Sequence, residues 1–126
     1  MAIIADSGAL IGFDRGDRVV TAILEAALRR GEPVLSSSGC IAQAWRSGGP
    51  RQALLARLLK SVDERSLDSD VSRAIGALCA KSGVSDVVDG HVSTLVSAGD
   101  LLMTSDIEDL GALLKASRVD AVIHRC

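Results

Sequence analysis

Short apolar runs alternate along the chain with longer segments in which apolar residues recur every three or four positions. A continuous apolar run is typical of a strand that is covered on both faces of a sheet. Four such runs occupy residues 2–5, 33–35, 101–104 and 121–124. Residues 61–67 could form one more strand, although three consecutive charged residues weaken that prediction.

The segments between these runs have helical periodicity. Helices are predicted over residues 20–28, 54–59, 71–79, 85–98 and 107–115, with Gly31 and Gly83 at two C-terminal ends and Ser85 as an N-cap. Strands alternating with helices predict an α/β protein, a three-layer α/β/α sandwich with a short, mostly parallel central sheet. Because no repeat or linker interrupts the pattern, residues 1–126 are expected to form a single domain.

Acidic residues follow two of the predicted strands directly. Asp6 comes after the first run and Asp106 after residues 101–104, so both should lie at the carboxyl edge of the sheet, where ligands bind in such folds. Asp89 lies at the margin of the apolar stripe of its helix, and Asp86 lies further toward solvent. Carboxylates that converge in a crevice require protonation or a cation between them. An all-oxygen ligand set favours Mg²⁺ or Mn²⁺, and such a site suits hydrolysis of a nucleic-acid backbone.

Each acid also has a purely structural interpretation. Asp6 and Asp106 are suitable helix N-caps, and Asp109 stands at the third helical position after Asp106. Asp86 is favoured as a first-turn acid that stabilises the helix dipole. His91 falls on the buried stripe, which favours a hydrogen-bonded core histidine.

Composition excludes several classes of protein. The formal net charge is −2, which argues against bulk electrostatic binding of nucleic acid, and Phe13 and Trp45 are too few for a base-stacking platform. The three cysteines have no paired spacing and are interpreted as small apolar fillers in a reduced, cytoplasmic protein. No run is long enough to cross a bilayer, and the N-terminus lacks the features of a secretion signal.

Four segments together resemble the PIN-domain ribonucleases, specifically VapC-type toxins of bacterial toxin–antitoxin pairs. They are residues 3–10 (IIADSGAL), 41–46 (IAQAWR), 85–92 (SDVVDGHV) and 104–110 (TSDIEDL), and they span nearly the whole chain. The resemblance implies RNA cleavage at a Mg²⁺ or Mn²⁺ site formed by Asp6, Asp89 and Asp106, with Asp109 as an additional outer ligand. It also implies an antitoxin partner and a homodimer.

One position departs from the family pattern: Gln43 stands where the family usually has a glutamate. The amide can still offer its carbonyl oxygen to a metal, so Gln43 is expected to assist the three catalytic aspartates, but the loss of one negative charge should weaken binding of a divalent ion. A second hypothesis is therefore a catalytically impaired binding module on the same fold. A third is a phosphoacceptor signalling domain, which the single acid at Asp6 and the absence of a lysine after residues 101–104 disfavour.

Overall fold

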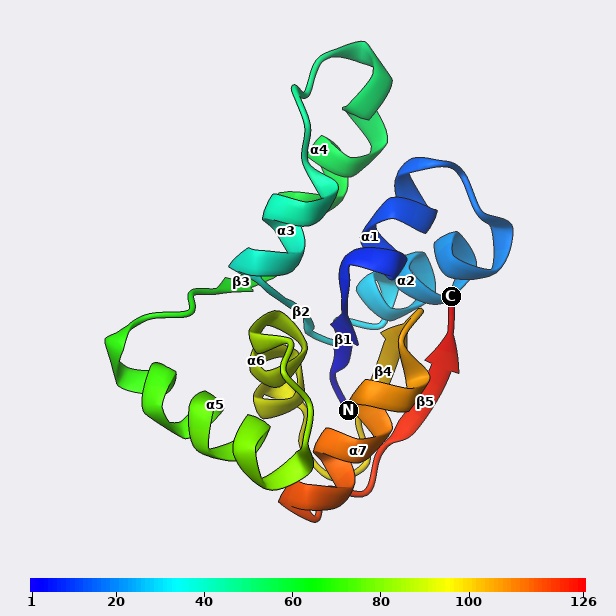
Figure 1. Ribbon diagram of the computed structural model, residues 1–126. Coiled ribbons are helices and arrows are strands. Elements are labelled where there is room, and N and C mark those ends of the chain that lie inside the picture. The colour runs from blue at the N-terminus through cyan, green and yellow to red at the C-terminus, as the bar shows by residue number, and fades with distance from the viewer.

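Five parallel strands form one sheet in the computed structural model, which describes residues 1–126 (Figure 1). The strands are β1 (Ile3–Ala5), β2 (Val34–Ser37), β3 (Asp63–Arg65), β4 (Leu101–Thr104) and β5 (Val122–Arg125). Their order is β3-β2-β1-β4-β5, and Ile3 of β1 pairs with Val34 on one side and Leu101 on the other. The central strand β1 is completely buried, as its unbroken apolar sequence predicts.

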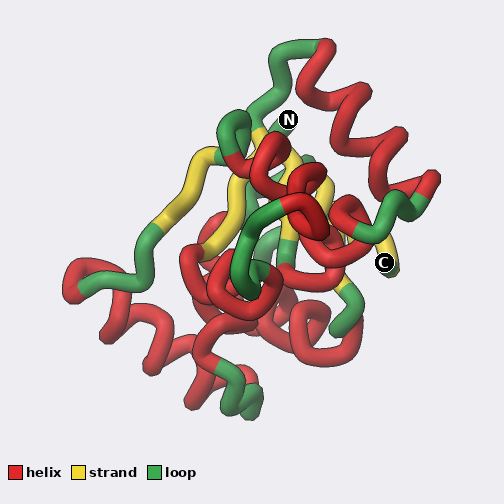
Figure 2. The backbone as a smooth tube through the Cα atoms, turned by 90° about the horizontal axis from the view of Figure 1, so that it is seen from above, coloured by secondary structure: helices red, strands yellow, loops and turns green.

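Helices cover both faces of this sheet. They are α1 (Ser7–Asp14), α2 (Arg18–Arg29), α3 (Ser38–Ala44), α4 (Ala53–Leu59), α5 (Ser69–Ser82), α6 (Val87–Leu95) and α7 (Ile107–Ser117), with a 3₁₀ turn at Pro50–Gln52. Helix α1 contacts α2, α3 and α4, whereas α5, α6 and α7 contact one another (Figures 1 and 2). Right-handed crossovers explain this division, because the chain builds outward from β1 in one direction as far as β3 and then in the other direction through β4 and β5.

The predicted three-layer α/β architecture is confirmed, and the sheet is entirely parallel. The doubtful segment 61–67 does contain a strand, β3, which lies at the sheet edge with every residue exposed. Its exposure explains why charged side chains are tolerated there. The strands and the helices on both faces of the sheet share one core cluster of 23 buried apolar residues.

Several local predictions are corrected. Asp86, not Ser85, caps α6, and this helix ends at Leu95 instead of reaching residue 98. Helices α1 and α3 were not predicted from periodicity: both are short, and α1 shows little separation of apolar and polar faces. Cys40 is buried, as a filler should be, but Cys126 is exposed. None of the helices combines the length and hydrophobicity that a membrane crossing requires.

Candidate metal centre

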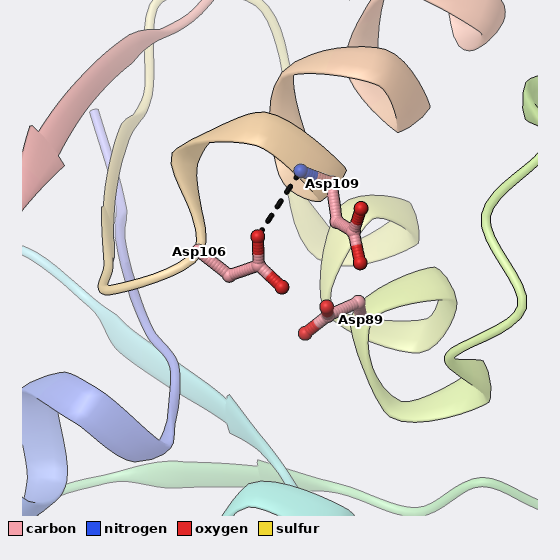
Figure 3. Close-up of side chains that lie close together, drawn as sticks. All are labelled: Asp89, Asp106 and Asp109. Atoms are coloured by element: carbon pink, nitrogen blue, oxygen red, sulfur yellow. Dashed lines mark hydrogen bonds between the residues drawn. The ribbon is translucent and has the colours of Figure 1, made fainter.

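Three aspartates converge at the carboxyl edge of the sheet, close to where the strand order reverses between β1 and β4. Crevices form at such switch points because the connections after the two strands leave toward opposite faces. Asp89 comes from α6, and Asp106 and Asp109 come from the start of α7 (Figure 3). One carboxylate oxygen from each of the three lies within 4.8 Å of the other two.

Helix capping fixes the positions of these acids. Asp106 is the N-cap of α7, and its side chain accepts a hydrogen bond of 3.1 Å from the backbone N–H of Asp109 (Figure 3). Asp86 caps α6 in the same way, accepting from the N–H groups of Val88 and Asp89. The capping interpretation of Asp106 is therefore confirmed, whereas Asp86 is the N-cap of its helix and not the first-turn acid that was predicted. For Asp106, capping leaves the second carboxylate oxygen available for a ligand.

The cluster is electrostatically unfavourable without a cation. The pKa of Asp89 is raised to about 7, first by removal of its carboxyl group from water and then by Asp106, Asp86 and Asp6. The pKa of Asp109 is raised as well, by partial loss of water contact and by the neighbouring Asp106. Like charges held close together favour the protonated form, and a divalent cation would reverse that preference.

Asp6 is not one of the three members of this cluster. It follows β1, is only 3% exposed and caps α1, with Oδ1 accepting from the N–H groups of Gly8 at 2.8 Å and Ala9 at 3.4 Å. Burial raises the pKa of Asp6, although its hydrogen bonds oppose that rise. Its charge is close enough to contribute to the raised pKa of Asp89. Asp6 is therefore a buried acid near the cluster but outside it.

Thr104 connects Asp6 to Asp106, a role that the sequence pattern did not reveal. The hydroxyl of Thr104 donates to Oδ2 of Asp6 and accepts a hydrogen bond of 2.9 Å from the N–H of Asp106. Thr104 is completely buried at the end of β4. The only sequence signal was a hydroxyl residue two positions before a candidate ligand, which is too common a pattern to single out Thr104.

Gln43 is exposed on α3 and makes no hydrogen bond with the acids. Its helix nevertheless borders the site. Burial raises the pKa of Cys40, one turn earlier on α3, to about 12, and the charges of Asp6 and Asp89 add to that rise. The pKa of the Cys126 thiol is raised to about 11, mainly by partial loss of contact with water. Neither thiol is therefore activated as a nucleophile.

His91 is a core histidine, as its position on the buried stripe predicted. It is 1% exposed, and its Nδ1 lies 2.7 Å from the hydroxyl of Ser37 at the end of β2. Burial lowers the pKa of His91. Trp45 is partly exposed and packs over Gly48, where a Cβ atom would lie 2.7 Å from the indole ring.

Comparison with known proteins supports the fold. No family model and no curated protein matches the sequence. A chain in the crystal structure of VapBC2 from Rickettsia felis bound to a DNA fragment from their promoter superposes with a TM-score of 0.67. The match covers 98% of this chain and 99% of that chain at 11% sequence identity. Two chains can share a fold throughout their length at this level of identity, and the likeness extends to the fold alone.

Proposed function

We propose that this protein is a metal-dependent endoribonuclease that acts as the toxin of a toxin–antitoxin pair. The observation that carries the proposal is the convergence of Asp89, Asp106 and Asp109 at the switch point of a parallel sheet. Two further findings support it: the four VapC-like segments of the sequence, and the full-length structural likeness to a chain of a VapBC complex.

The donor set suits Mg²⁺ or Mn²⁺. The three clustered side chains offer only carboxylate oxygens, which hard divalent cations prefer, and no histidine or cysteine belongs to the group. The raised pKa of Asp89 also indicates a site where a cation would relieve repulsion. When bound, such an ion supplies Lewis-acid stabilisation of phosphoryl oxygens and lowers the pKa of water.

The residues of the chain have distinct roles in this proposal. The ion would be held by Asp89, Asp106 and Asp109. Asp6 would add negative charge near them while capping the start of α1. The Thr104 hydroxyl bonds to both residues and so fixes the backbone of Asp106 relative to the carboxylate of Asp6. Asp86 would act indirectly, by capping the helix that carries Asp89.

Gln43 keeps a second candidate function open, a binding module with the same fold and impaired catalysis. An exposed amide on α3 adds no charge to the rim of the site. Under this alternative, Gln43→Glu would switch on a metal-dependent cleavage that the natural protein lacks. A phosphoacceptor domain is disfavoured by topology, because flavodoxin-like domains of that type have strand order 2-1-3-4-5 and this sheet is ordered β3-β2-β1-β4-β5.

The proposed partners are a single-stranded RNA substrate, an antitoxin protein and a second copy of this chain. The neighbouring VapBC2 structure is a complex of two protein components, which supports an antitoxin for this chain. With a net charge of −2, the chain offers few excess positive charges, so binding of RNA should be modest.

The test is cleavage of a labelled single-stranded RNA by purified protein with Mg²⁺, with Mn²⁺ or with a chelator. The natural protein should cleave only when the ion is present. Asp89→Asn and Asp106→Asn should each lower the rate about a hundredfold or more, because each removes a carboxylate that holds the ion.

Glu108→Gln is the matched control, since Glu108 is an exposed acid of the same helical turn outside the cluster. It should retain most of the activity. Cleavage that persists in a chelator, or that is equal in the natural protein and in Asp89→Asn prepared in the same way, would refute the proposal.

A further inference from the structure

A second polar cavity lies on the far side of α6 from the acidic cluster. Its volume is about 380 Å³, and it is bordered by the end of β3, the start of α5 and the middle of α6. We call it the His91 pocket; the lining residues used below are Arg65, Asp68, Asp70, Val71, His91 and Leu95. Residues two apart on a helix point to nearly opposite sides, so Asp89 faces α7 while His91 faces this pocket.

The hydrogen bonds of Ser37 determine what His91 presents to the pocket. The Ser37 hydroxyl oxygen accepts a hydrogen bond of 3.0 Å from the N–H of Gly39, and its only other partner is Nδ1 of His91. The hydroxyl proton of this completely buried serine therefore points to Nδ1. The ring proton must then be on Nε2, which has no partner in the protein. His91 thus carries one unused hydrogen-bond donor although the residue is 1% exposed.

The other lining groups restrict the kind of ligand. Val71 and Leu95 supply apolar walls, whereas Asp68 and Asp70 lie at the rim. Asp68 accepts hydrogen bonds from Ser66 and from the N–H of Asp70, and the side chain of Asp70 has no partner. Arg65 also lines the pocket, but its guanidinium is paired with Asp63 at 2.7 Å. The unpaired carboxylate of Asp70 and that of Asp68 would therefore repel a phosphate group, so the pocket suits a flat, uncharged ring with a hydrogen-bond acceptor. Its volume lies within the range of small-molecule sites.

We propose that the His91 pocket is a nucleobase subsite, in which a base of the RNA substrate accepts a hydrogen bond from Nε2–H of His91. This inference rests on the proposed ribonuclease function and specifies how that site selects its substrate. The pocket adjoins the end of β3 and the acids adjoin the end of β4, so both lie along the carboxyl edge of the same parallel sheet, and an extended RNA strand that follows this edge passes from one to the other. Bases in single-stranded RNA are unstacked easily and can be read in such pockets.

Binding can be tested without any cleavage. The chain has two histidines, His91 and His124, so ¹⁵N-labelled histidine gives a simple spectrum in which His91→Asn identifies the His91 signals. We expect the Nε2–H form of His91, and its Nε2 resonance should shift when individual ribonucleosides are added. Val71→Trp, which fills the pocket from a partly exposed position, should abolish that shift. An Nδ1–H form, or no shift with any of the four ribonucleosides, would overturn the proposal.

A second arm uses the cleavage reaction. His91→Asn keeps an acceptor for the Ser37 hydroxyl but has no group at the position of Nε2. It should raise KM about tenfold for an RNA with all its bases, the effect expected of one lost hydrogen bond. On an RNA made abasic at the nucleotide that occupies the pocket, the variant and the natural protein should be equal. If His91→Asn raised KM equally on every abasic RNA, the proposed subsite would be refuted.

The two arms separate this proposal from the ribonuclease proposal. A protein that cleaves RNA but fails the ribonucleoside titration is a nuclease without this subsite. A protein that passes the titration but does not cleave RNA has the pocket without the proposed catalysis.

Discussion

Asp106 serves two purposes through its two carboxylate oxygens. Oδ1 accepts the N–H of Asp109 at the start of α7, and the carboxylate also lies in the acidic cluster. The two purposes differ chemically, because a cap requires only an acceptor oxygen whereas a cation site requires negative charge. Asparagine supplies the first and not the second, so one substitution can separate the two contributions.

Asp106→Asn should preserve the cap and remove a charge beside Asp89. Without divalent ions at pH 8, we expect the melting temperature to rise by about 2–5 °C, as relief of roughly 1 kcal/mol of repulsion would produce. The increase in melting temperature that Mn²⁺ gives the natural protein should be lost. Thermal melts with and without Mn²⁺ measure both effects.

Asp120→Asn is the control, since Asp120 is exposed and outside the cluster. It should change neither the melting temperature without divalent ions nor the increase that Mn²⁺ produces. A stabilisation by Mn²⁺ that survives in Asp106→Asn would exclude Asp106 from the metal site.

Gln43 offers the converse test, addition of a charge. Gln43→Glu should lower the Mn²⁺ concentration needed for half-maximal thermal stabilisation several-fold, because it brings a carboxylate to the border of a cluster that binds cations. Gln43→Ala should leave this concentration unchanged, since Gln43 makes no hydrogen bond in the structure. Equal values for the Glu and Ala variants would show that α3 lies too far from the ion to contribute.

At the scale of elements, α6 is held against α5 by a close contact at Gly90. A Cβ atom at this position would lie 2.8 Å from Sγ of Cys79 and 3.0 Å from the Ile75 side chain. Since Gly90 directly follows Asp89, this contact also sets how closely α6, which carries Asp89, approaches α5. The packing of two helices is thereby coupled to the geometry of the site.

Gly90→Ala should lower the free energy of unfolding by about 1–3 kcal/mol, the usual effect of overpacking. It should also lower the RNA cleavage rate, because α6 must move away from α5. Gly76→Ala on α5 is the matched control: a Cβ there meets nothing within 4 Å, and alanine should stabilise the helix by about 0.5–1 kcal/mol. Urea denaturation measures the free energy of unfolding of both variants. Equal stabilities for the two variants would contradict the close contact.

At the scale of the whole molecule, folding brings acids from distant parts of the chain to one edge of the sheet. The pKa of Asp89 is raised to about 7, and those of Asp6 and Asp109 are raised too. A carboxyl group whose pKa is higher in the folded state than in the unfolded state binds a proton on folding. Its contribution therefore becomes unfavourable as pH rises from the unfolded pKa to the folded one.

The stability of the protein without metal should accordingly decrease between about pH 4 and pH 7 because of Asp89. Relative to Asp89→Asn, whose amide does not titrate, the melting temperature of the natural protein should fall progressively across this range and then level off. Mn²⁺ at pH 7 to 8 should restore part of the difference, because it binds the charged form. Parallel curves for the two proteins would indicate that Asp89 does not titrate abnormally.

Much of this molecule is determined by its sequence. The apolar runs of β1 and β4 had to be buried on both faces, and the acids that follow them had to lie at the carboxyl edge of a parallel sheet. Helical periodicity located α2, α5 and α7, because each is long enough to separate a buried face from an exposed one. The short helices α1 and α3 were missed, whereas α4, equally short, was located by its four leucines.

Only the tertiary structure decided which groups meet. Asp109 joined Asp89 and Asp106, whereas Asp6 is buried outside the cluster and hydrogen-bonded to Gly8 and Thr104. The hydroxyl of Thr104 and the unused donor of His91 depend on contacts between residues far apart in the chain. The apolar periodicity of a sequence indicates which side of an element is buried. The position of one oxygen relative to another is set by how the elements pack, and that information is distributed over the whole core.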